Sequence, residues 1–397
     1  MKISSEKFAE KIINILNQNS YEAFFVGGCV RDRLLGREIH DYDITTNAPP
    51  HKVQEVLFPI KTYATAIKHG TITAVEGENK IEITTYRIDG SYADNRHPES
   101  VVFTDSLTLD LTRRDFTVNA MAYHPKVGIV DPFGGQADLE KRILRCVGNP
   151  HDRFEEDALR IMRALRFMAV LGFAAEKETK AAIHTQKHLL NNISSERIKS
   201  ELEQLICSSN PDSVLKEYAD VIICALKIEG TESLYTKLSV SPKKRDMRFA
   251  LLLCRTENPL EIMRSLKCEK KLTNESISLI EDISFYPRSK IDMAQYLIKH
   301  GAAHAHNALT IKQILSEKSA DAFSAFLKEI ENNSPFFSLE DLDIKAIDLT
   351  QNFSVRGAEL GSTLHYLLLQ SASGNIKNTK AALLKAAENH IKANLRS

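Results

Sequence analysis

The sequence predicts an α+β protein, with a small mixed sheet and its helices in residues 1–140 and helices alone in the remainder. Three observations support this fold class. Short runs rich in β-branched and aromatic residues occur in the N-terminal part, separated by turns and helical patterns. After about Leu139, apolar residues instead recur at helical spacing as far as Ser397. A chain of 397 residues is also too long for one ordinary core, so we expect several domains.

Four runs are expected to form the strands of the N-terminal sheet: residues 22–26, 42–45, 71–75 and 80–86. Later in the chain, Ser, Asn and Pro cluster near residues 207–211, 240–244 and 332–337. These clusters are candidate domain boundaries within the helical part.

Composition excludes several classes of protein. Lys and Glu interrupt the apolar positions of residues 1–17, and no later window approaches the roughly 20 uncharged apolar residues of a membrane span. We therefore expect a cytoplasmic protein without membrane association. The six cysteines are scattered, which favours buried free thiols over a zinc or redox site. With 52 basic and 52 acidic residues the chain has no global positive field, so any contact with nucleic acid must come from local patches. No stable protein partner is evident.

An apolar run ends at Gly27 and Gly28 and then resumes as a helical pattern that contains Arg31. Glycines at such a strand-to-helix turn bring the backbone close to a phosphate group, with free N–H groups at the start of the helix. A turn that only serves packing is the alternative interpretation.

Asp41 and Asp43 flank Tyr42 within a strand-like run. Residues two apart in a strand point to the same face, so these carboxylates could share one or two Mg²⁺ ions. Glu82 lies in another β-branched run and could complete the site if the two strands are neighbours. The alternatives are turn or N-cap roles for the two aspartates and a solvent-facing position for Glu82.

A helix is expected around residues 157–168. Its apolar residues fall on one arc, whereas four charged residues occupy the opposite side, namely Asp157, Arg160, Arg163 and Arg166. A spacing of three would put Asp157 next to Arg160, which offers a carboxylate acceptor and a guanidinium fork. A solvated face with Glu155 and Glu156 as partners is the alternative.

These residues carry a resemblance to a known family. The segment from Gly27 to Thr45 resembles the signature of polymerase-β-type nucleotidyltransferases, and specifically the class II tRNA nucleotidyltransferase (CCA-adding enzyme) and bacterial poly(A) polymerase family. The similarity continues in family order through residues 113–121, 131–139, 156–167 and 195–205, so it covers about residues 20–206.

The resemblance implies a nucleotidyltransferase head at 1–140, a helical neck with base recognition at 141–207, a helical body at 208–332 and a helical, tRNA-binding tail at 333–397. It implies template-independent addition of CCA to tRNA 3′ ends from CTP and ATP, with Mg²⁺ as cofactor. The tRNA would be held by its acceptor stem and TΨC arm.

The resemblance also implies roles for individual residues. Asp41 and Asp43, with Glu82 as a possible third ligand, would hold two Mg²⁺ ions that activate the 3′ hydroxyl and stabilise pyrophosphate. The expected nucleotide-binding residues, which carry the triphosphate, ribose and base contacts, are Gly27, Gly28, Arg31, Arg114, Asp115, Asn119, Asp157, Arg160, Arg163 and Arg166. Among them, Arg114 and Asp115 would seat the ribose, and Asp157 and Arg160 would read the base.

Related activities stay open. A polar segment at 87–98 resembles the flexible loop of complete CCA-adding enzymes, and residues 68–73 resemble the CCA-adding form more than poly(A) polymerase. An enzyme that adds only the terminal A, a poly(A) polymerase and a non-catalytic RNA-binding protein remain as alternatives. His300, His304 and His306 could form a metal cluster, although helix-cap or surface roles are favoured.

Overall fold

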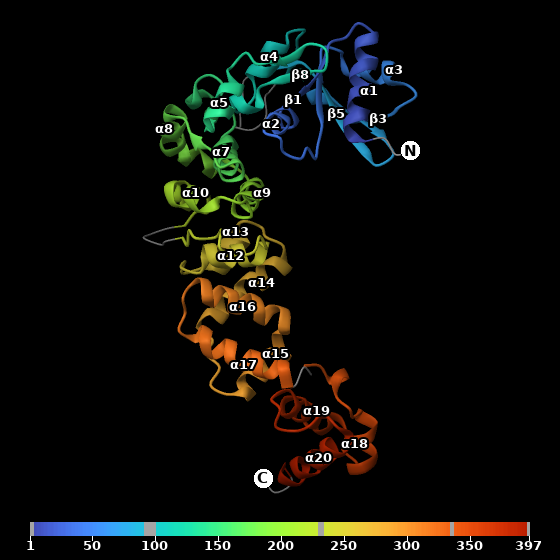
Figure 1. Ribbon diagram of the computed structural model, residues 1–397, viewed down its shortest axis with the longest axis vertical. Helices are drawn as coiled ribbons and strands as arrows, with labels where there is room; N and C mark the ends of the chain where they lie inside the picture. Colours follow the sequence, from blue (N-terminus) through green and yellow to red (C-terminus); the bar gives the residue numbers. More distant parts are fainter. Residues whose placement is uncertain (1–3, 91–100, 229–233, 334–336, 395–397) are drawn as a thin grey trace. The chain divides into compact units, whose positions relative to one another are not determined.

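The computed structural model describes residues 4–90, 101–228, 234–333 and 337–394. The chain forms two compact units (Figure 1): Met1–Ser239 with Glu261–Cys268, and Val240–Leu260 with Glu269–Ser397. The second unit begins at the Ser- and Pro-containing stretch that was expected to be a boundary. The finer division into head, neck, body and tail stays a prediction.

The first unit contains a mixed sheet with strand order β3-β4-β5-β2-β1-β8-β9. The strands are β1 (Ala23–Val26), β2 (Asp43–Thr46), β3 (Lys61–Ala66), β4 (Thr71–Glu76), β5 (Asn79–Thr85), β8 (Ala122–His124) and β9 (Gly128–Val130). Neighbouring β2 and β5 are parallel, whereas β1 is antiparallel to both β2 and β8. The four expected strands are β1, β2, β4 and β5, so these predictions are confirmed within one or two residues at each end.

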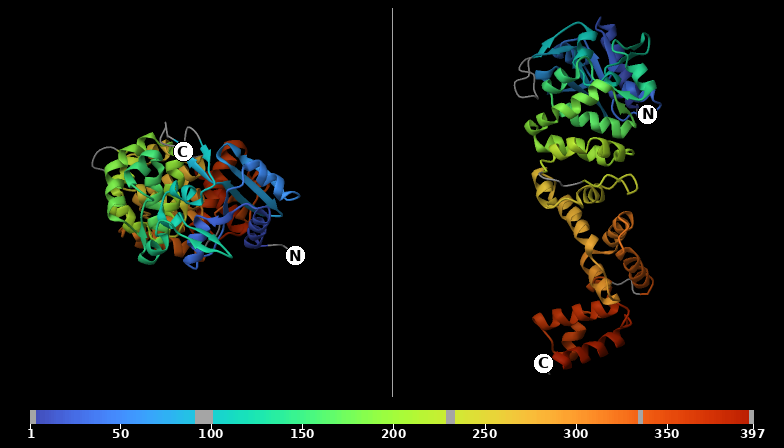
Figure 2. Two further views of the ribbon diagram at one scale, coloured as in Figure 1. Left: turned by 90° about the horizontal axis from the view of Figure 1, so that it is seen from above. Right: turned by 90° about the vertical axis from the view of Figure 1, so that its left-hand side faces the viewer.

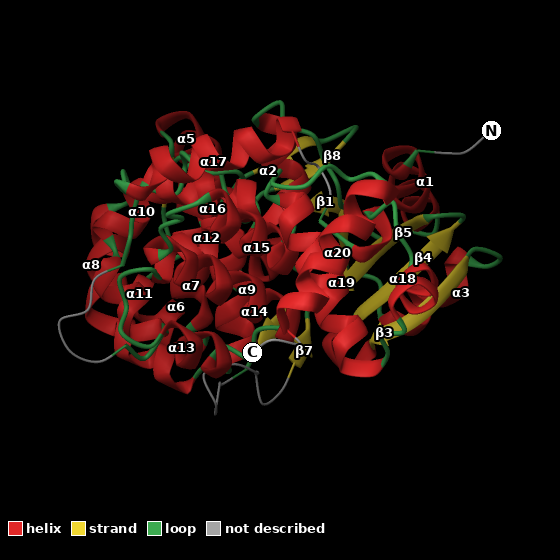
Figure 3. Ribbon diagram, turned by 90° about the horizontal axis from the view of Figure 1, so that it is seen from below, coloured by secondary structure: helices red, strands yellow, loops and turns green. Residues whose placement is uncertain are grey.

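Helices cover both faces of this sheet. The amphipathic α1 (Ser5–Gln18) packs on α3 (Pro50–Leu57), and both contact the strands, so they share one face (Figure 3). On the other face, Phe24 and Val26 of β1 pack against Leu111 of α4 (Leu107–Thr112). The short α2 (Gly28–Leu34) follows β1 directly, which places the double glycine at the C-terminal end of this inner strand.

Helices dominate the rest of the first unit, as expected. They are α5 (Gly135–Lys141), α6 (Pro150–Glu156), α7 (Leu159–Leu171), α8 (Lys177–Gln186), α9 (Ser195–Ile206), α10 (Pro211–Glu217) and α11 (Ala219–Ala225). Most of α13 (Pro259–Ser265) also belongs to the first unit, because the chain returns to it at Glu261–Cys268. The 3₁₀ turns are Ile67–His69, Thr117–Asn119 and Lys187–Asn192. A two-residue pair, β10 (Ile143–Leu144) and β11 (Ala174–Ala175), departs from the expectation that strands end near residue 139.

The first residues of the segment expected to be a loop, 87–98, form a strand instead. Residues Arg87–Asp89 form β6, which pairs with β7 (Val101–Phe103). The polar sequence of these residues suggested a loop. They form a strand because they pair with β7, which lies outside the segment that the prediction considered. Residues 91–100 lie outside the described residues.

The second unit is helical. Its helices are α12 (Arg245–Leu253), α14 (Lys270–Glu281), α15 (Lys290–His300), α16 (Ala302–Ile314), α17 (Ser319–Asn333), α18 (Ala346–Phe353), α19 (Gly357–Ala372) and α20 (Lys380–Asn394), with 3₁₀ turns η4 (Asp282–Ser284) and η5 (Leu339–Asp341). The last three helices enclose a core built from Leu349, Leu367 and Leu383 (Figure 2, red). The predicted all-helical remainder is thus confirmed for the described residues, apart from the β10–β11 pair.

Two further predictions concern composition. All six cysteines are free, but only Cys29 and Cys146 are buried, and the other four are half-buried. Within the described ranges, none of the helices has the length and apolar character needed to cross a membrane.

Candidate active site

A cavity of about 480 Å³ opens in the first unit where β1, β2, α2 and α7 come together. It is lined by Gly27, Gly28, Cys29, Arg31, Asp32, Ile39, His40, Asp41, Asp43, Arg114, Asp115, Asn119, Arg163, Arg166 and Phe167. Ten of the thirteen residues expected from the sequence to bind metal or nucleotide lie in this lining. Glu82, Asp157 and Arg160 do not.

The turn at Gly27 requires glycine. Its φ is +77°, and a Cβ added there would lie 3.3 Å from Nη1 of Arg114. Residues other than glycine rarely adopt this backbone conformation. The turn therefore lets the backbone pass close to Arg114 and leaves the first N–H groups of α2 at the cavity wall.

Asp43 is the first residue of β2 and opens onto the cavity. Its Cα partner in the parallel pairing is Glu82 of β5. The two strands are therefore neighbours, which is the condition under which Glu82 was expected to complete the metal site. Asp41 departs from the prediction, because β2 begins only at Asp43 and Asp41 lies in the preceding loop. The loop nevertheless brings Asp41 to the same cavity.

The carboxylates affect one another's ionisation. Asp43 is accessible from the cavity, yet desolvation there, together with the negative charges of Glu82 and Asp41, raises the pKa of Asp43 to about 6. A carboxylate cluster of this kind is stabilised by a bound cation.

A buried polar chain crosses the cavity from α2 to α7. Arg31 donates from Nη1 to Oδ1 of Asn119 (2.7 Å), and Asn119 donates to Oδ1 of Asp115 (3.1 Å). Arg163 donates from Nε and Nη2 to Oδ2 of Asp115 (2.9 and 2.6 Å). Burial alone would raise the pKa of Asp115, but the charge and hydrogen bonds of Arg163 lower it to about 2.

Arg31 is held more firmly than the sequence suggested. Its Nε and Nη2 donate to the two carboxylate oxygens of Asp32 at 3.0 and 2.8 Å. The guanidinium is therefore fixed in orientation beside Gly28, and Asp32 offsets part of its charge.

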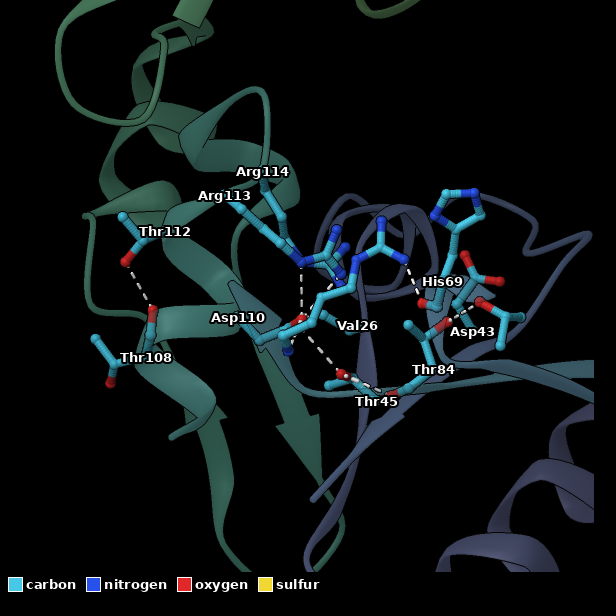
Figure 4. A network of polar contacts seen from close by, with 12 residues as sticks. Val26, Asp43, Thr45, His69, Thr84, Thr108, Asp110, Thr112, Arg113 and Arg114 are labelled. Carbon is cyan, nitrogen blue, oxygen red and sulfur yellow. Dashed lines mark hydrogen bonds and ion pairs between the residues drawn. The ribbon is translucent and has the colours of Figure 1, made fainter. Parts of the chain in front are cut away.

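Asp110 is a residue that the sequence analysis missed (Figure 4). This fully buried carboxylate of α4 accepts hydrogen bonds from Arg113 (2.9 Å), Arg114 (3.4 Å) and the hydroxyl of Thr45 on β2 (3.0 Å). Burial would raise the pKa of Asp110, but the two guanidinium groups lower it overall. The signal was present as an Asp near the end of α4 that is followed three and four residues later by arginines.

The expected base-reading pair differs from the prediction. Helix α7 begins at Leu159, so Asp157 precedes it and is not part of the charged helix face. Both carboxylate oxygens of Asp157 accept from Nη2 of Arg197 on α9 (3.3 and 3.1 Å), and Oδ1 also accepts from the backbone N–H of Leu159 (3.1 Å). The N-terminal turn interrupts the helical spacing from which the pair was inferred.

Arg160 is buried on α7 rather than exposed on a charged face. It donates to Oε2 of Glu156 (2.6 Å) and to the backbone carbonyls of Arg153 (3.0 Å) and Arg113 (2.9 Å). Glu156 is the partner that the alternative interpretation named. Arg160 thereby connects α7 to the segment that carries Arg114 and Asp115.

The other half of α7 agrees with the prediction. Its apolar arc is buried, and Arg163 and Arg166 line the cavity. Arg166 also pairs with Glu201 of α9 (2.6 Å) and stacks on Phe167, with its guanidinium carbon 4.1 Å from the ring centroid.

Family models match most of the chain. Residues 23–145 match the poly A polymerase head domain, and residues 172–221 match the model described as "Probable RNA and SrmB- binding site of polymerase A". Residues 241–387 match domain 2 of tRNA nucleotidyltransferases.

Individual relatives match over most of their length. The CCA-adding enzyme of Geobacillus kaustophilus is 40% identical over 313 residues, which cover 77% of each protein. The CCA-adding enzyme of Ligilactobacillus salivarius is 34% identical over 403 residues, 96% of each protein. The crystal structure of the Bacillus stearothermophilus CCA-adding enzyme in complex with CTP covers 100% of both chains with a TM-score of 0.83 and 30% identity.

Proposed function

The chain belongs to the CCA-adding tRNA nucleotidyltransferase family, and we propose that it completes tRNA 3′ ends by adding C, C and A from CTP and ATP without a template. The observation that carries this proposal is the single cavity that brings two aspartates of the Asp41-Tyr42-Asp43 motif together with four arginines. The structural neighbour of 30% identity was solved in complex with CTP, which supports a nucleotide ligand for this chain.

Enzymes of this family depend on metal ions, and we propose that Asp41 and Asp43 hold Mg²⁺, with Glu82 beside them as a further carboxylate. The donor set fits, because Mg²⁺ prefers carboxylate oxygens. The pKa of Asp43 is raised first by burial and then by the negative charges of Glu82 and Asp41, which a bound cation would offset. When bound, the ions would polarise the 3′ hydroxyl of the tRNA and the phosphates of the nucleotide.

The charges of the cavity support a metal–triphosphate ligand. Its lining contains four arginines and four aspartates, so the protein alone offers no net charge to a triphosphate. Divalent ions on the aspartates would leave the arginines in excess and make the cavity attractive to a polyanion.

The protein's own groups then position the nucleotide. We assign the triphosphate to the backbone N–H groups after Gly27 and to Arg31, whose orientation Asp32 and Asn119 fix. Arg114 and Asp115 are assigned to the ribose. Asp115 is kept ionised by Arg163, so it acts as a hydrogen-bond acceptor for a hydroxyl group.

Base selection is assigned to Asp157, which precedes α7, and Arg160, which lies in its first turn. In the structure each already has protein partners, Arg197 and Glu156 respectively. Reading a base would require at least one of these ion pairs to open, which suits a site that accepts cytosine first and adenine afterwards.

Two parts of the proposal concern the remaining chain. We assign tRNA binding, through the acceptor stem and TΨC arm, to the helices after the cavity, and the tail of residues 333–397 is included in that assignment. The cytoplasmic location expected from the N-terminal sequence stays a prediction.

The experiment that tests the proposed function uses three tRNA transcripts that end at the discriminator base, at C and at CC. Each is incubated with the full-length protein and Mg²⁺, with CTP, ATP or both. Complete CCA ends on all three, with arrest after CC when ATP is omitted, are the expected result. Extension of the CC transcript alone indicates an A-adding enzyme, long A tails indicate a poly(A) polymerase, and no transfer at all indicates an RNA-binding protein without catalysis.

A further inference from the structure

The second unit contains a cluster of metal-ligating side chains that the nucleotide cavity does not use. Asp282, His300 and His304 each offer one donor atom, and these three atoms all lie within 4.8 Å of one another. Asp282 is buried, and the side chains of Asp282 and His304 are only 10% and 16% exposed.

The cluster is built by a turn between two helices. His300 is the last residue of α15, and His304 lies in the first turn of α16. Gly301 between them has a φ of +80°, which ends α15 and lets α16 begin at the next residue. As a result the two imidazole rings stack, with centroids 4.9 Å apart and planes inclined by 22°.

The donor atoms lie close to one another. The hydroxyl of Ser278 lies 3.5 Å from Nδ1 of His300 and 3.4 Å from Nε2 of His304. The same Nε2 atom is 2.7 Å from Oδ2 of Asp282, at the end of α14. Three elements, α14 with η4, α15 and α16, therefore direct nitrogen or oxygen donors inward.

A neighbouring residue fixes the orientation of the ligands. The hydroxyl of Tyr296 donates to Oδ2 of Asp282 at 2.6 Å, and its ring stacks on His300 at 4.7 Å between centroids. Hydrogen bonds to ligating carboxylates and packing against ligating imidazoles are typical of the shell around a metal site.

We propose that Asp282, His300 and His304 bind a divalent transition-metal ion of the Zn²⁺ type. Two imidazole nitrogens and one carboxylate suit Zn²⁺ or Co²⁺, whereas Mg²⁺ prefers oxygen ligands only. Ligand distances of about 2.0–2.2 Å place neighbouring donors roughly 3.3 Å apart. The observed separations, from 2.7 Å to at most 4.8 Å, bracket that value. The fourth position is left for water.

Such an ion would join the end of α14 to α15 and α16. It would stabilise the second unit by mass action, because it binds a preformed set of ligands in the folded state. The proposal is independent of the proposed function, since it concerns a different unit and different residues.

The test is a titration of the tag-free, metal-free full-length protein with Co²⁺ in the presence of saturating Mg²⁺. Saturating Mg²⁺ competes with Co²⁺ for the carboxylate site proposed for the cavity, so the Co²⁺ absorption reports on the mixed nitrogen and oxygen site. We expect one equivalent per chain, with the intense visible absorption of four-coordinate Co²⁺, and displacement by Zn²⁺. A wild-type protein without this absorption overturns the proposal, and that result needs no variant.

Variants locate the site. His300→Ala and His304→Ala should each lower Co²⁺ affinity by at least ~100-fold, since even an outer partner of a metal ligand contributes 10–100-fold. His306→Ala is the matched control, because His306 lies on the same helix but is exposed and binds Glu331 at 2.9 Å. Circular dichroism confirms that each variant is folded. Absorption that survives both ligand substitutions, or is lost equally in His306→Ala, assigns the metal elsewhere and overturns the proposal.

Discussion

Asp43 and Glu82 are direct register partners on the neighbouring parallel strands β2 and β5. Their side chains are therefore neighbours on the same face of the sheet, although the residues are far apart in the sequence. Asp43 opens onto the cavity and Glu82 does not line it, so the two carboxylates are expected to contribute unequally to catalysis.

Substitution of Asp43 by Asn should lower the rate of nucleotide transfer by at least ~100-fold, because a metal ligand is lost. Glu82→Gln should have a smaller effect. Single-turnover incorporation from CTP measures the rate, and fluorescence anisotropy measures tRNA binding, which should be retained. Glu76→Gln on β4, whose carboxylate pairs with Lys11 at the surface, is the control and should be unaffected. Loss of tRNA binding together with transfer in Asp43→Asn would indicate a structural role instead.

Asp110 should act by positioning Arg114. Asp110→Asn removes the charge that holds two arginines, so the free energy of unfolding should fall by ~3 kcal/mol. The KM for CTP and ATP should rise by roughly 10-fold or more, since the ribose-binding group loses its fixed position. Urea unfolding and steady-state kinetics measure the two effects.

A variant of a second buried aspartate, Asp138, is the control that distinguishes a loss of stability from a loss of substrate binding. Asp138 accepts from Thr117 at 2.7 Å and Arg145 at 3.1 Å, away from the cavity lining. Asp138→Asn should destabilise the protein without changing KM. If both variants raise KM alike, Asp110 has no specific positioning role.

The sequence predicted the cavity better than it predicted the contacts within it. Local patterns located Gly27 and Asp43 because turns and strands are encoded by neighbouring residues. Asp110 was missed because one of its hydrogen-bond partners, Thr45, is 65 positions away in the sequence. The pairing of Asp157 with Arg197 was likewise invisible, since it requires α9 to pack on the start of α7.

The ion pair between Arg163 and Asp115 should make stability depend on pH. The pKa of Asp115 is about 2 in the folded protein, below its ordinary value of 3.8, so folding favours the ionised form. This stabilisation is complete above about pH 4 and is lost as the pH falls towards 2. Arg163→Gln should therefore be less stable than the wild type by about 2 kcal/mol at pH 7, from a shift of roughly two pKa units.

Urea unfolding followed by circular dichroism at pH 7, 4 and 2.5 measures this difference. It should shrink only below pH 4. A difference that is constant over this range would mean that Arg163 stabilises the protein by packing on Phe167, whose ring centroid lies 5.5 Å from its guanidinium carbon.

Asp157 should influence which base is accepted more than how fast it is added. A carboxylate that reads a base edge contributes roughly 1–3 kcal/mol of discrimination, so Asp157→Ala should raise misincorporation of UTP and GTP by ~10-fold or more. Incorporation of CTP into the transcript that ends at the discriminator base should slow less than this. Competition assays with mixed nucleotides measure both values.

Arg197→Met is the matched comparison, because Arg197 donates to both carboxylate oxygens of Asp157, at 3.3 and 3.1 Å. If the carboxylate of Asp157 itself contacts the base, Arg197→Met should leave selectivity largely intact. Asp157→Ala should lower selectivity, because the carboxylate is then absent. Equal relaxation in both variants would mean that Arg197 must hold the carboxylate in place for selection to occur. Unchanged selectivity in Asp157→Ala contradicts base reading by this residue and would leave Arg160 as the remaining candidate of the pair.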